Sequence, residues 1–324
     1  MQRIILVWIG LVLMVAVALA APGAVTGAVP SGDGPRVVVL GTAQDGGMPQ
    51  TACACDRCTR ARSNPALARR VASLAIDFPK TGRTYLIDAT PDLAAQLEEI
   101  HAFRAHPAGR TDRRPVDGLF LTHAHIGHYL GLAQFGLESL NSKALPLYVS
   151  PRFAGFLRSN GPWSQLVRLD NVAIREFEIG KPVPLEAGVT VTPIQVPHRD
   201  EFSDTMAFLI KGPRRRLLYV PDTDTWDTWS TPLPEILKDV DLALLDATFY
   251  SADELPDRDL TKIRHPLVTS TMDLLAPLVG KGRLHVYFTH LNHSNPALDR
   301  DGAARRNIEA RAFHVLDEDD EFAL

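Results

Sequence analysis

Leu119-Phe-Leu-Thr-His-Ala-His-Ile-Gly-His128 is the stretch that decides how this chain folds. The apolar run from Val116 to Leu121 predicts a buried strand. Three histidines follow where that strand ends: His123, His125 and His128. Neutral imidazole is a common ligand of zinc and similar metals, and a strand end can direct alternate side chains into one space. Because the chain has 11 histidines in 324 residues, this grouping indicates a metal site rather than a chance cluster.

A second metal-binding pattern lies upstream, in Cys53-Ala-Cys55-Asp-Arg-Cys58, and it contains every cysteine of the chain. A disulfide is the alternative, but these three cysteines could form one bridge at most, across a very short loop. Three thiolates suit one tetrahedral zinc ion that takes its fourth ligand from elsewhere in the chain. The cysteine motif therefore predicts a structural zinc site.

The histidine motif, Thr-His-x-His-x-x-His after a hydrophobic strand, resembles the metallo-β-lactamase superfamily, whose signature is His-x-His-x-Asp-His. The resemblance implies the α/β class and an αββα sandwich, in which two mixed β-sheets are flanked by helices. We expect one such domain over residues 35–324. This chain has Gly127 where the family has the Asp that binds a second metal. The resemblance thus implies a second metal that is held weakly, held differently or absent.

The cysteine motif narrows the resemblance to two branches of the superfamily. It follows a predicted strand, Arg36–Leu40, and a Gly-rich loop. Both the pyrroloquinoline quinone biosynthesis protein B family and the phosphodiesterase of the carbon–phosphorus lyase pathway open in this way. In the phosphodiesterase, a histidine at the position of His293 completes the zinc site of the three cysteines. His290-Leu-Asn-x-x-Asn-Pro296 resembles the quinone-biosynthesis branch.

The resemblance also implies the residues of the catalytic centre. Three histidines would bind one metal, two more would bind a second, and one carboxylate would bridge them. In that order, they are His123, His125, His198, His128, His290 and Asp222, with Asp224 as the substitute for Asp222. Asp88 matches the family's strand-end aspartate, which usually orients a metal-binding histidine. Asp246 repeats the pattern of a strand followed by Asp, which indicates a supporting or structural role rather than a catalytic one. His265 matches an active-site histidine of the phosphodiesterase and predicts a proton donor or substrate contact, with an exposed loop histidine as the alternative.

Asp45 offers a replacement for the carboxylate that is missing at Gly127. It lies in the loop Gly41–Gly47, which follows the first strand and runs near the metal edge in this fold. A turn aspartate before two glycines is the alternative. Zinc is the expected metal, with one structural ion and one or two catalytic ions. Iron or manganese also suits the catalytic ligands.

Together these motifs predict a metal-dependent hydrolase, with Asp222 and His265 in catalytic roles. A bound metal lowers the pKa of its water and produces a hydroxide nucleophile for an ester-like or phosphodiester-like small molecule. One alternative is an iron-dependent oxidative enzyme like the quinone-biosynthesis branch. The other is a non-catalytic binding protein on the same fold, and the retained histidines argue against it.

Residues 1–20 have the features of a secretory signal peptide. Arg3 precedes an apolar run, and Ala18-Leu-Ala20 is a small-x-small cleavage pattern. We expect cleavage after Ala20, a flexible lead at 21–34 and export to the bacterial periplasm. An uncleaved N-terminal membrane anchor is the alternative, because the run is nearly long enough to span a bilayer.

The net charge of the chain bears on which classes of molecule it can bind. Without residues 1–20, the chain has 33 basic and 38 acidic residues, a net charge of −5. This balance provides no electrostatic footprint for nucleic acid or an anionic membrane, so we expect a small-molecule substrate. The oligomeric state has no signature in the sequence.

Overall fold

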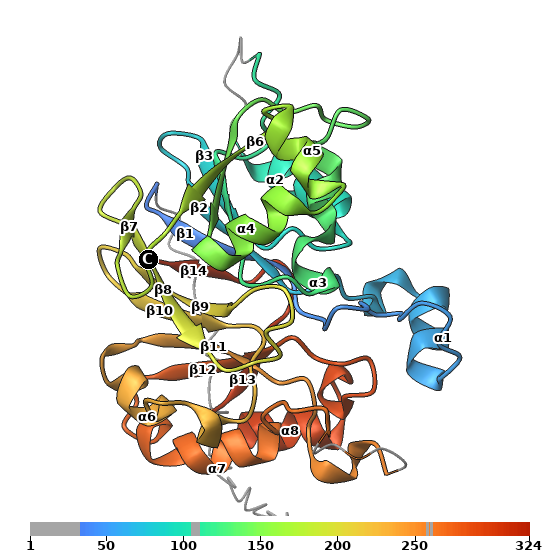
Figure 1. Ribbon diagram of the computed structural model, residues 1–324. Coiled ribbons are helices and arrows are strands. Elements are labelled where there is room, and N and C mark those ends of the chain that lie inside the picture. Colours follow the sequence, from blue (N-terminus) through green and yellow to red (C-terminus); the bar gives the residue numbers. More distant parts are fainter. Residues whose placement is uncertain (1–32, 105–110, 257–258, 260–261) are drawn as a thin grey trace, which may run out of the picture.

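Two seven-stranded sheets form the centre of the molecule, and helices cover their outer faces (Figure 1). The computed structural model describes residues 33–104, 111–256, 259 and 262–324. The predicted signal peptide, 1–20, lies outside the described residues, as does the predicted lead except for residues 33 and 34. Within the described ranges, no helix is both long and apolar enough to span a membrane.

Each sheet is described by its hydrogen-bonded neighbours. The first contains, in order, β14 (Glu321–Ala323), β1 (Arg36–Gly41), β2 (Ser73–Phe78), β3 (Arg83–Ile87), β4 (Gly118–Phe120), β5 (Leu145–Val149) and β6 (Val172–Glu176). The second contains, in order, β13 (His314–Val315), β12 (His285–Thr289), β11 (Leu242–Asp246), β10 (Arg216–Val220), β9 (Thr205–Lys211), β8 (Thr190–Val196) and β7 (Val183–Pro184).

Both sheets change from antiparallel to parallel pairing across their width. In the first, the pairs from β14 to β3 are antiparallel and those from β3 to β6 are parallel. In the second, the pairs from β7 to β10 are antiparallel and those from β10 to β13 are parallel. The parallel parts bring the carboxyl ends of several strands to one edge, which is where open α/β sheets bind their ligands.

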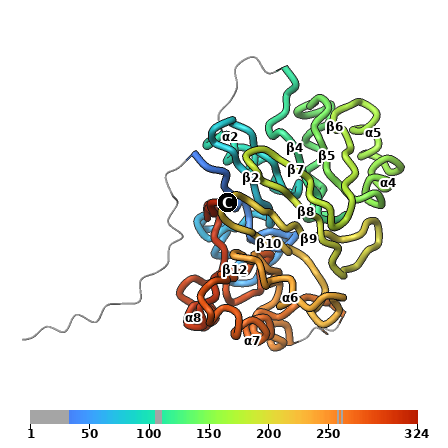
Figure 2. The backbone as a smooth tube through the Cα atoms, turned by 90° about the vertical axis from the view of Figure 1, so that its left-hand side faces the viewer, coloured from blue at the N-terminus to red at the C-terminus, as the bar shows by residue number. Residues whose placement is uncertain are grey.

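Most of the helices fall into two groups that lie on opposite sides of the paired sheets. Their bounds are α1 (Asp56–Ser63), α2 (Leu93–Phe103), α3 (Ile126–Tyr129), α4 (Pro151–Ser159), α5 (Trp163–Arg168), α6 (Leu233–Ile236), α7 (Val268–Val279) and α8 (Ala303–Ala310). In Figure 1, α2, α4 and α5 lie beside the first sheet, and α6, α7 and α8 lie beside the second. The tube in Figure 2 separates the same two groups.

The core follows the two-residue period of the strands. In β1, Val38 and Leu40 pack with the residues of α2 and α4, whereas Val37 and Val39 pack between the two sheets. Strand β10 alternates in the same way between the centre and the side of α7 and α8. Alternate residues of a strand point to opposite faces, so an apolar strand can fill two core layers at once. This layered arrangement confirms the predicted αββα sandwich.

The strand that leads into the histidines is shorter than predicted. It ends at Phe120, although Leu121 N still donates a hydrogen bond to Tyr148 O (3.1 Å). The next amide, Thr122 N, donates to Asp88 Oδ1 (2.8 Å). A carboxylate thus replaces the neighbouring strand as the acceptor, and the chain leaves the sheet just before the first histidine.

Candidate metal centre

The residues of the candidate centre lie at the carboxyl ends of the parallel strands. Asp88 follows β3, His123 lies shortly after β4, Asp222 shortly after β10, and His290 directly after β12, while Asp246 ends β11. Asp88 and His290 adopt left-handed backbone, with φ of 67° and 59°. Such backbone is costly for a residue with a side chain and persists where the surrounding structure dictates it. Both sheets therefore direct polar side chains into one buried space.

A first cluster brings together three histidines and one carboxylate. His125 Nδ1 lies 2.9 Å from His123 Nε2 and 3.1 Å from His198 Nε2. Asp222 Oδ2 lies 3.3 Å from His123 Nε2 and 3.2 Å from His198 Nε2. Ligands at 2.0–2.1 Å in a tetrahedral zinc site are about 3.3 Å apart. These four atoms therefore have the spacing of a zinc coordination shell.

A second cluster shares that carboxylate. Asp45 Oδ1 lies 3.3 Å from His128 Nε2 and 3.5 Å from His290 Nε2. Asp222 Oδ2 lies 3.7 Å and 4.0 Å from the same two nitrogens. His128 Nε2, His290 Nε2 and Asp45 Oδ1 are buried and have no hydrogen-bond partner. Orphaned buried polar atoms that converge in this way fit a metal ion, because a bound cation would satisfy all of them.

The carboxylates in these clusters remain ionised. Burial alone would raise the pKa of Asp222, but His198 and His290 outweigh burial and hold it well below its usual value. Burial also opposes ionisation of Asp45, whose pKa is nevertheless held well below its usual value by His128 and His290. Ionised carboxylates among imidazoles are the donor set that zinc, iron and manganese accept.

Gly127 is the position that makes room for Asp45. A Cβ atom at residue 127 would lie 2.1 Å from Asp45 Oδ1, 2.5 Å from Asp45 Cγ and 2.8 Å from Asp45 Cα. No side chain fits at residue 127 while Asp45 occupies this place, because real Cβ contacts do not fall below about 3 Å. The carboxylate of Asp45 thus lies beside the position where the resembling family carries its aspartate.

At the end of the first sheet, one threonine and one carboxylate hold the Nδ1 atoms of His123 and His128, the ring nitrogens that point away from the clusters. Thr122 Oγ1 donates to Asp88, at 2.9 Å from Oδ2, and lies 3.0 Å from His123 Nδ1. His128 Nδ1 lies 2.7 Å from Asp88 Oδ2. Burial and the neighbouring His128 lower the pKa of His123, whereas Asp88 and Asp45 overcome burial and raise the pKa of His128. Because each Nδ1 is held on the outer side, each Nε2 points toward the clusters, where a bound metal would take the place of a proton.

The second sheet repeats this arrangement, in which a threonine and an aspartate hold the Nδ1 atom of a histidine. Thr248 Oγ1 donates to Asp246 Oδ1 (2.8 Å) and lies 3.0 Å from His290 Nδ1. Asp246 Oδ2 also accepts from His265 Nδ1 (2.8 Å), and the same nitrogen lies 3.4 Å from Asp222 Oδ1. Burial would lower the pKa of His265, but the carboxylates of Asp246 and Asp222 raise it to about 9. His265 is therefore protonated at neutral pH and lies beside the candidate bridging carboxylate.

Two further acidic residues hold the remaining histidines. Glu201 Oε2 lies 2.9 Å from His125 Nε2, and Asp224 Oδ1 lies 3.3 Å from His198 Nδ1. Asp224, the predicted substitute for Asp222, thus contacts the outer nitrogen of His198 rather than the cluster itself. No sequence pattern indicated Glu201. The two threonines were also missed, although each stands next to a predicted site residue or two positions from one.

All three cysteines are free and surround one histidine. The Nδ1 atom of His293 lies 3.6, 3.7 and 3.5 Å from the Sγ atoms of Cys53, Cys55 and Cys58. A tetrahedral zinc ion with Zn–S of 2.3 Å would hold sulfur and nitrogen about 3.5 Å apart. The predicted alternative, a disulfide, is not formed. The four residues have the composition and spacing of a closed zinc site.

A short backbone pairing connects the cysteine site to the second cluster. Ala43 forms a parallel bridge with Leu291, and Gln44 N donates to Leu291 O (2.9 Å). Asn292 Nδ2 donates to Gln44 Oε1 (2.6 Å). The segment that carries His290 and His293 is thereby paired with the segment that ends at Asp45. The same backbone pairing therefore supports ligands of the cysteine site and ligands of the second cluster.

Comparison with known proteins agrees with this geometry. The family model described as "Beta-lactamase superfamily domain" matches residues 83–310. Coenzyme PQQ synthesis protein B from Methylobacterium sp. (strain 4-46) is 26% identical over 299 residues, 86% of this chain and 97% of that protein. The protein of the same name from Rhodopseudomonas palustris (strain ATCC BAA-98 / CGA009) is 28% identical over 309 residues, 86% and 96% of the two chains.

Solved structures share the fold. Zn(2+)-bound PqqB from Methylobacterium extorquens has a TM-score of 0.73 and 24% identity, with 89% of this chain and 100% of that chain covered. A diphosphatase from the PhnP family has a TM-score of 0.59 and 22% identity, with 89% and 97% covered. The family model confirms the predicted superfamily, and the sequence relatives, together with the shared fold, confirm the resemblance to the quinone-biosynthesis branch.

Proposed function

The chain belongs to the beta-lactamase superfamily, and from this premise we propose that it is an exported metal-dependent hydrolase of an ester-like or phosphodiester-like small molecule. One observation carries the proposal. Five histidines have one ring nitrogen held by Thr122, Glu201, Asp88, Asp224 or Thr248. The other nitrogen lies 3.2–4.0 Å from Asp222 Oδ2 in four of them, and in the fifth, His125, it lies beside the inner nitrogens of His123 and His198. Imidazoles oriented in this way present lone pairs to a common centre, which is how proteins prepare metal ligands.

The proposed ligands fall into three sets. His123, His125, His198 and Asp222 would hold one metal; Asp45, His128, His290 and Asp222 a second; and Cys53, Cys55, Cys58 and His293 a structural zinc. A metal bound at the first two sets would activate water and polarise a carbonyl or phosphoryl oxygen.

His265 supplies the proton in this proposal. Its Nδ1–H is held by Asp246 Oδ2, so its Nε2–H would be the group that protonates the leaving oxygen. The carboxylates that raise its pKa to about 9 keep the acid form available at neutral pH. Asp222 would be a ligand of both metals, and its Oδ1, 3.4 Å from His265 Nδ1, helps to keep that ring in place.

Metal content tests the proposal first. Protein purified without chelator and without added metal should contain about three metals per chain by elemental analysis, at least one of them zinc. Asp222→Ala should remove about two of them, because Asp222 belongs to both active-site sets. The matched control is Asp227→Ala, at an exposed acid outside these sets, which should keep all three. Equal metal content in Asp222→Ala and the unchanged protein would contradict the shared centre.

Activity is the second test. The metal-loaded protein is screened with bis(4-nitrophenyl) phosphate, 4-nitrophenyl acetate and simple lactones. His265→Asn should lower kcat by about 10²–10⁴-fold while metal content stays unchanged, because it removes the proton donor. A fully loaded protein without turnover of any of these compounds would count against a hydrolase.

An oxidative role like that of the PQQ synthesis proteins is the second candidate. The observation that favours it is the similarity to those proteins over 86% of this chain. Iron in place of zinc in the catalytic clusters, together with oxygen consumption when a peptide-derived tyrosine substrate is added, would favour this role over hydrolysis.

Export is a separate part of the proposal. It predicts that the mature chain starts at Ala21, as mass spectrometry of the N-terminus would show. Leu11→Arg, which charges the apolar run, should leave the protein unprocessed in the cytoplasm. Recovery of an intact N-terminus in the membrane fraction would instead support the anchor.

A further inference from the structure

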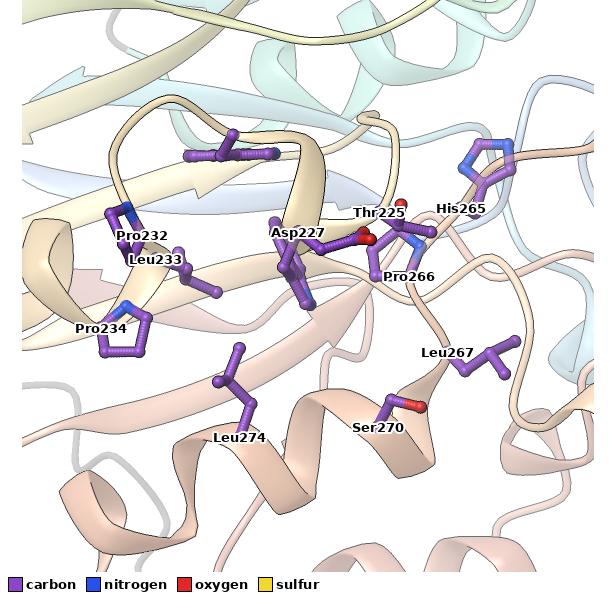
Figure 3. A pocket seen from close by; sticks show the side chains of 12 residues that line it. Thr225, Asp227, Pro232, Leu233, Pro234, His265, Pro266, Leu267, Ser270 and Leu274 are labelled. Atoms are coloured by element: carbon purple, nitrogen blue, oxygen red, sulfur yellow. The ribbon is translucent and has the colours of Figure 1, made fainter. Parts of the chain in front are cut away.

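An apolar cavity of about 520 Å³ lies beside the candidate metal centre. It is bounded by the chain that follows β10 and by the start of α7. Figure 3 shows His265 and Pro266 on one side of it, with Pro232, Leu233 and Pro234 on the opposite side. Its volume is in the range of small-molecule sites, which are mostly apolar with a few polar groups that fix orientation.

His265 connects this cavity to the catalytic clusters. The residue lines the cavity, and its Nδ1 contacts Asp246 Oδ2 (2.8 Å) and Asp222 Oδ1 (3.4 Å). Thr225, which also lines the cavity, directly follows Asp224, the residue that holds His198. A molecule in the cavity would therefore lie within reach of the reacting bond.

The aromatic wall of the cavity has no polar group to offer. Trp226 Nε1 donates to Thr271 Oγ1 (2.8 Å), and Trp229 Nε1 donates to Thr223 Oγ1 (2.9 Å). The two rings lie 5.3 Å apart at an angle of 66°. Because both indole N–H groups are already bonded within the protein, the rings are fixed and present only carbon to the cavity.

Away from His265, the wall of the cavity offers no cation to an anionic group. None of the twelve lining residues is Lys or Arg, and Asp227 adds a carboxylate. The one cationic group on the wall, His265, already faces the carboxylates of Asp246 and Asp222. Leu274, on α7, is 41% exposed, which is unfavourable for a large apolar side chain unless something covers it. In this part of the cavity a phosphate or carboxylate group would find no cationic partner, whereas an apolar group would cover Leu274 and the indole rings.

We propose that this cavity binds an uncharged apolar group of the substrate, aromatic or branched aliphatic, next to the bond that reacts at the metal centre. The substrate class is thus an ester or phosphodiester with a bulky hydrophobic substituent. The proposal rests on the proposed function for the position of the reacting bond. The cavity itself, and its preference for an apolar group, can be tested without turnover.

Binding of two phosphonates to the zinc-loaded protein tests the cavity. Phenylphosphonate should bind about 10–100-fold more tightly than methylphosphonate by calorimetry, because its ring is removed from water. Leu274→Asp and Ser270→Trp should reduce this ratio below about threefold, the first by charging the wall and the second by filling the space. Both positions are exposed, so the fold should tolerate the changes. Leu169→Asp is the matched control at another exposed leucine and should keep the ratio.

The outcomes separate the two proposals. Equal or absent binding of the phosphonates, or a ratio that survives both Leu274→Asp and Ser270→Trp, would overturn the apolar subsite. A phenyl preference that depends on Leu274, in a protein that hydrolyses no ester or phosphodiester, supports the subsite and overturns the hydrolase. Turnover without any phenyl preference overturns the subsite alone.

Discussion

Gly127→Asp restores the aspartate of the superfamily signature, and we expect it to damage this protein. The new Cβ would lie 2.1 Å from Asp45 Oδ1 and 2.8 Å from Asp45 Cα, so rotating the Asp45 side chain cannot relieve the contact. The loop that carries Asp45 must move. Overpacking of this kind costs about 1–3 kcal/mol, which corresponds to a decrease in Tm of about 2–6 °C for a chain of this size.

The same change should disturb metal binding. Asp45 Oδ1 lies 3.3 and 3.5 Å from the free nitrogens of His128 and His290, and displacing it removes one of four donors. We expect zinc affinity at this cluster to fall by at least about 10–100-fold, with one metal lost per chain after dialysis. Asp45→Asn should cause a similar loss without overpacking, since it removes the charge and keeps the shape.

The assay combines thermal unfolding with elemental analysis after equilibrium dialysis. Gly155→Asp is the matched control, because a Cβ at residue 155 meets nothing within 4 Å. The double variant Asp45→Gly/Gly127→Asp should regain part of the stability and the metal that Gly127→Asp loses. Two results would refute the idea that Asp45 takes the place of the family aspartate. One is that Asp45→Asn keeps the metal content and affinity of the unchanged protein. The other is that the effects of Asp45→Gly and Gly127→Asp on stability and metal content simply add in the double variant.

Three further changes test other parts of the structure. Cys58→Ser should release the zinc of the cysteine site. It should also weaken metal binding at Asp45 and His290, because the pairing of Gln44 with Leu291 and Asn292 supports both metal sites. Elemental analysis should then show that more than one metal per chain is lost. Thr122→Val, which leaves His123 Nδ1 and Asp88 without their hydroxyl partner, should cost about 1–3 kcal/mol in urea unfolding and lower zinc affinity about 10–100-fold. Burial, opposed by Arg70 but reinforced by Asp319, raises the pKa of Glu99 to about 7. A carboxyl whose pKa is raised on folding lowers stability as pH rises from about 4.5 through 7, so Glu99→Gln should be more stable than the unchanged protein by about 1–3 kcal/mol at pH 7.5 and show little difference at pH 4.5 in urea unfolding.

Local motifs were enough to predict the fold and most of the residues that meet at the centre, through their resemblance to the metallo-β-lactamase superfamily. A run of apolar residues that ends in His or Asp indicates both the strand and the edge at which its last side chain will lie, as at His123, Asp222 and His290. Three of the four ligands of the cysteine site likewise lie within six consecutive residues, Cys53 to Cys58. These features depend on sequence spacing and strand geometry, which are local properties of the chain.

The tertiary structure decided which distant residues share a contact. Glu201 lies 76 positions from His125, and no motif connects the two. The cavity exists only because a loop after β10 packs against α7, with its indole groups held by threonines.

The sequence by itself determined the strand-end positions of the histidines and, through the family resemblance that its motifs carry, the αββα class and the absence of the family aspartate at Gly127. Only the tertiary structure decided that Asp45 lies in the vacated space, 82 positions away in the chain. The physical reason is that steric exclusion and metal-ligand spacing act through space. The glycine at position 127 shows in the sequence that a side chain is missing. Which atom fills that space depends on how the loops pack in the folded chain.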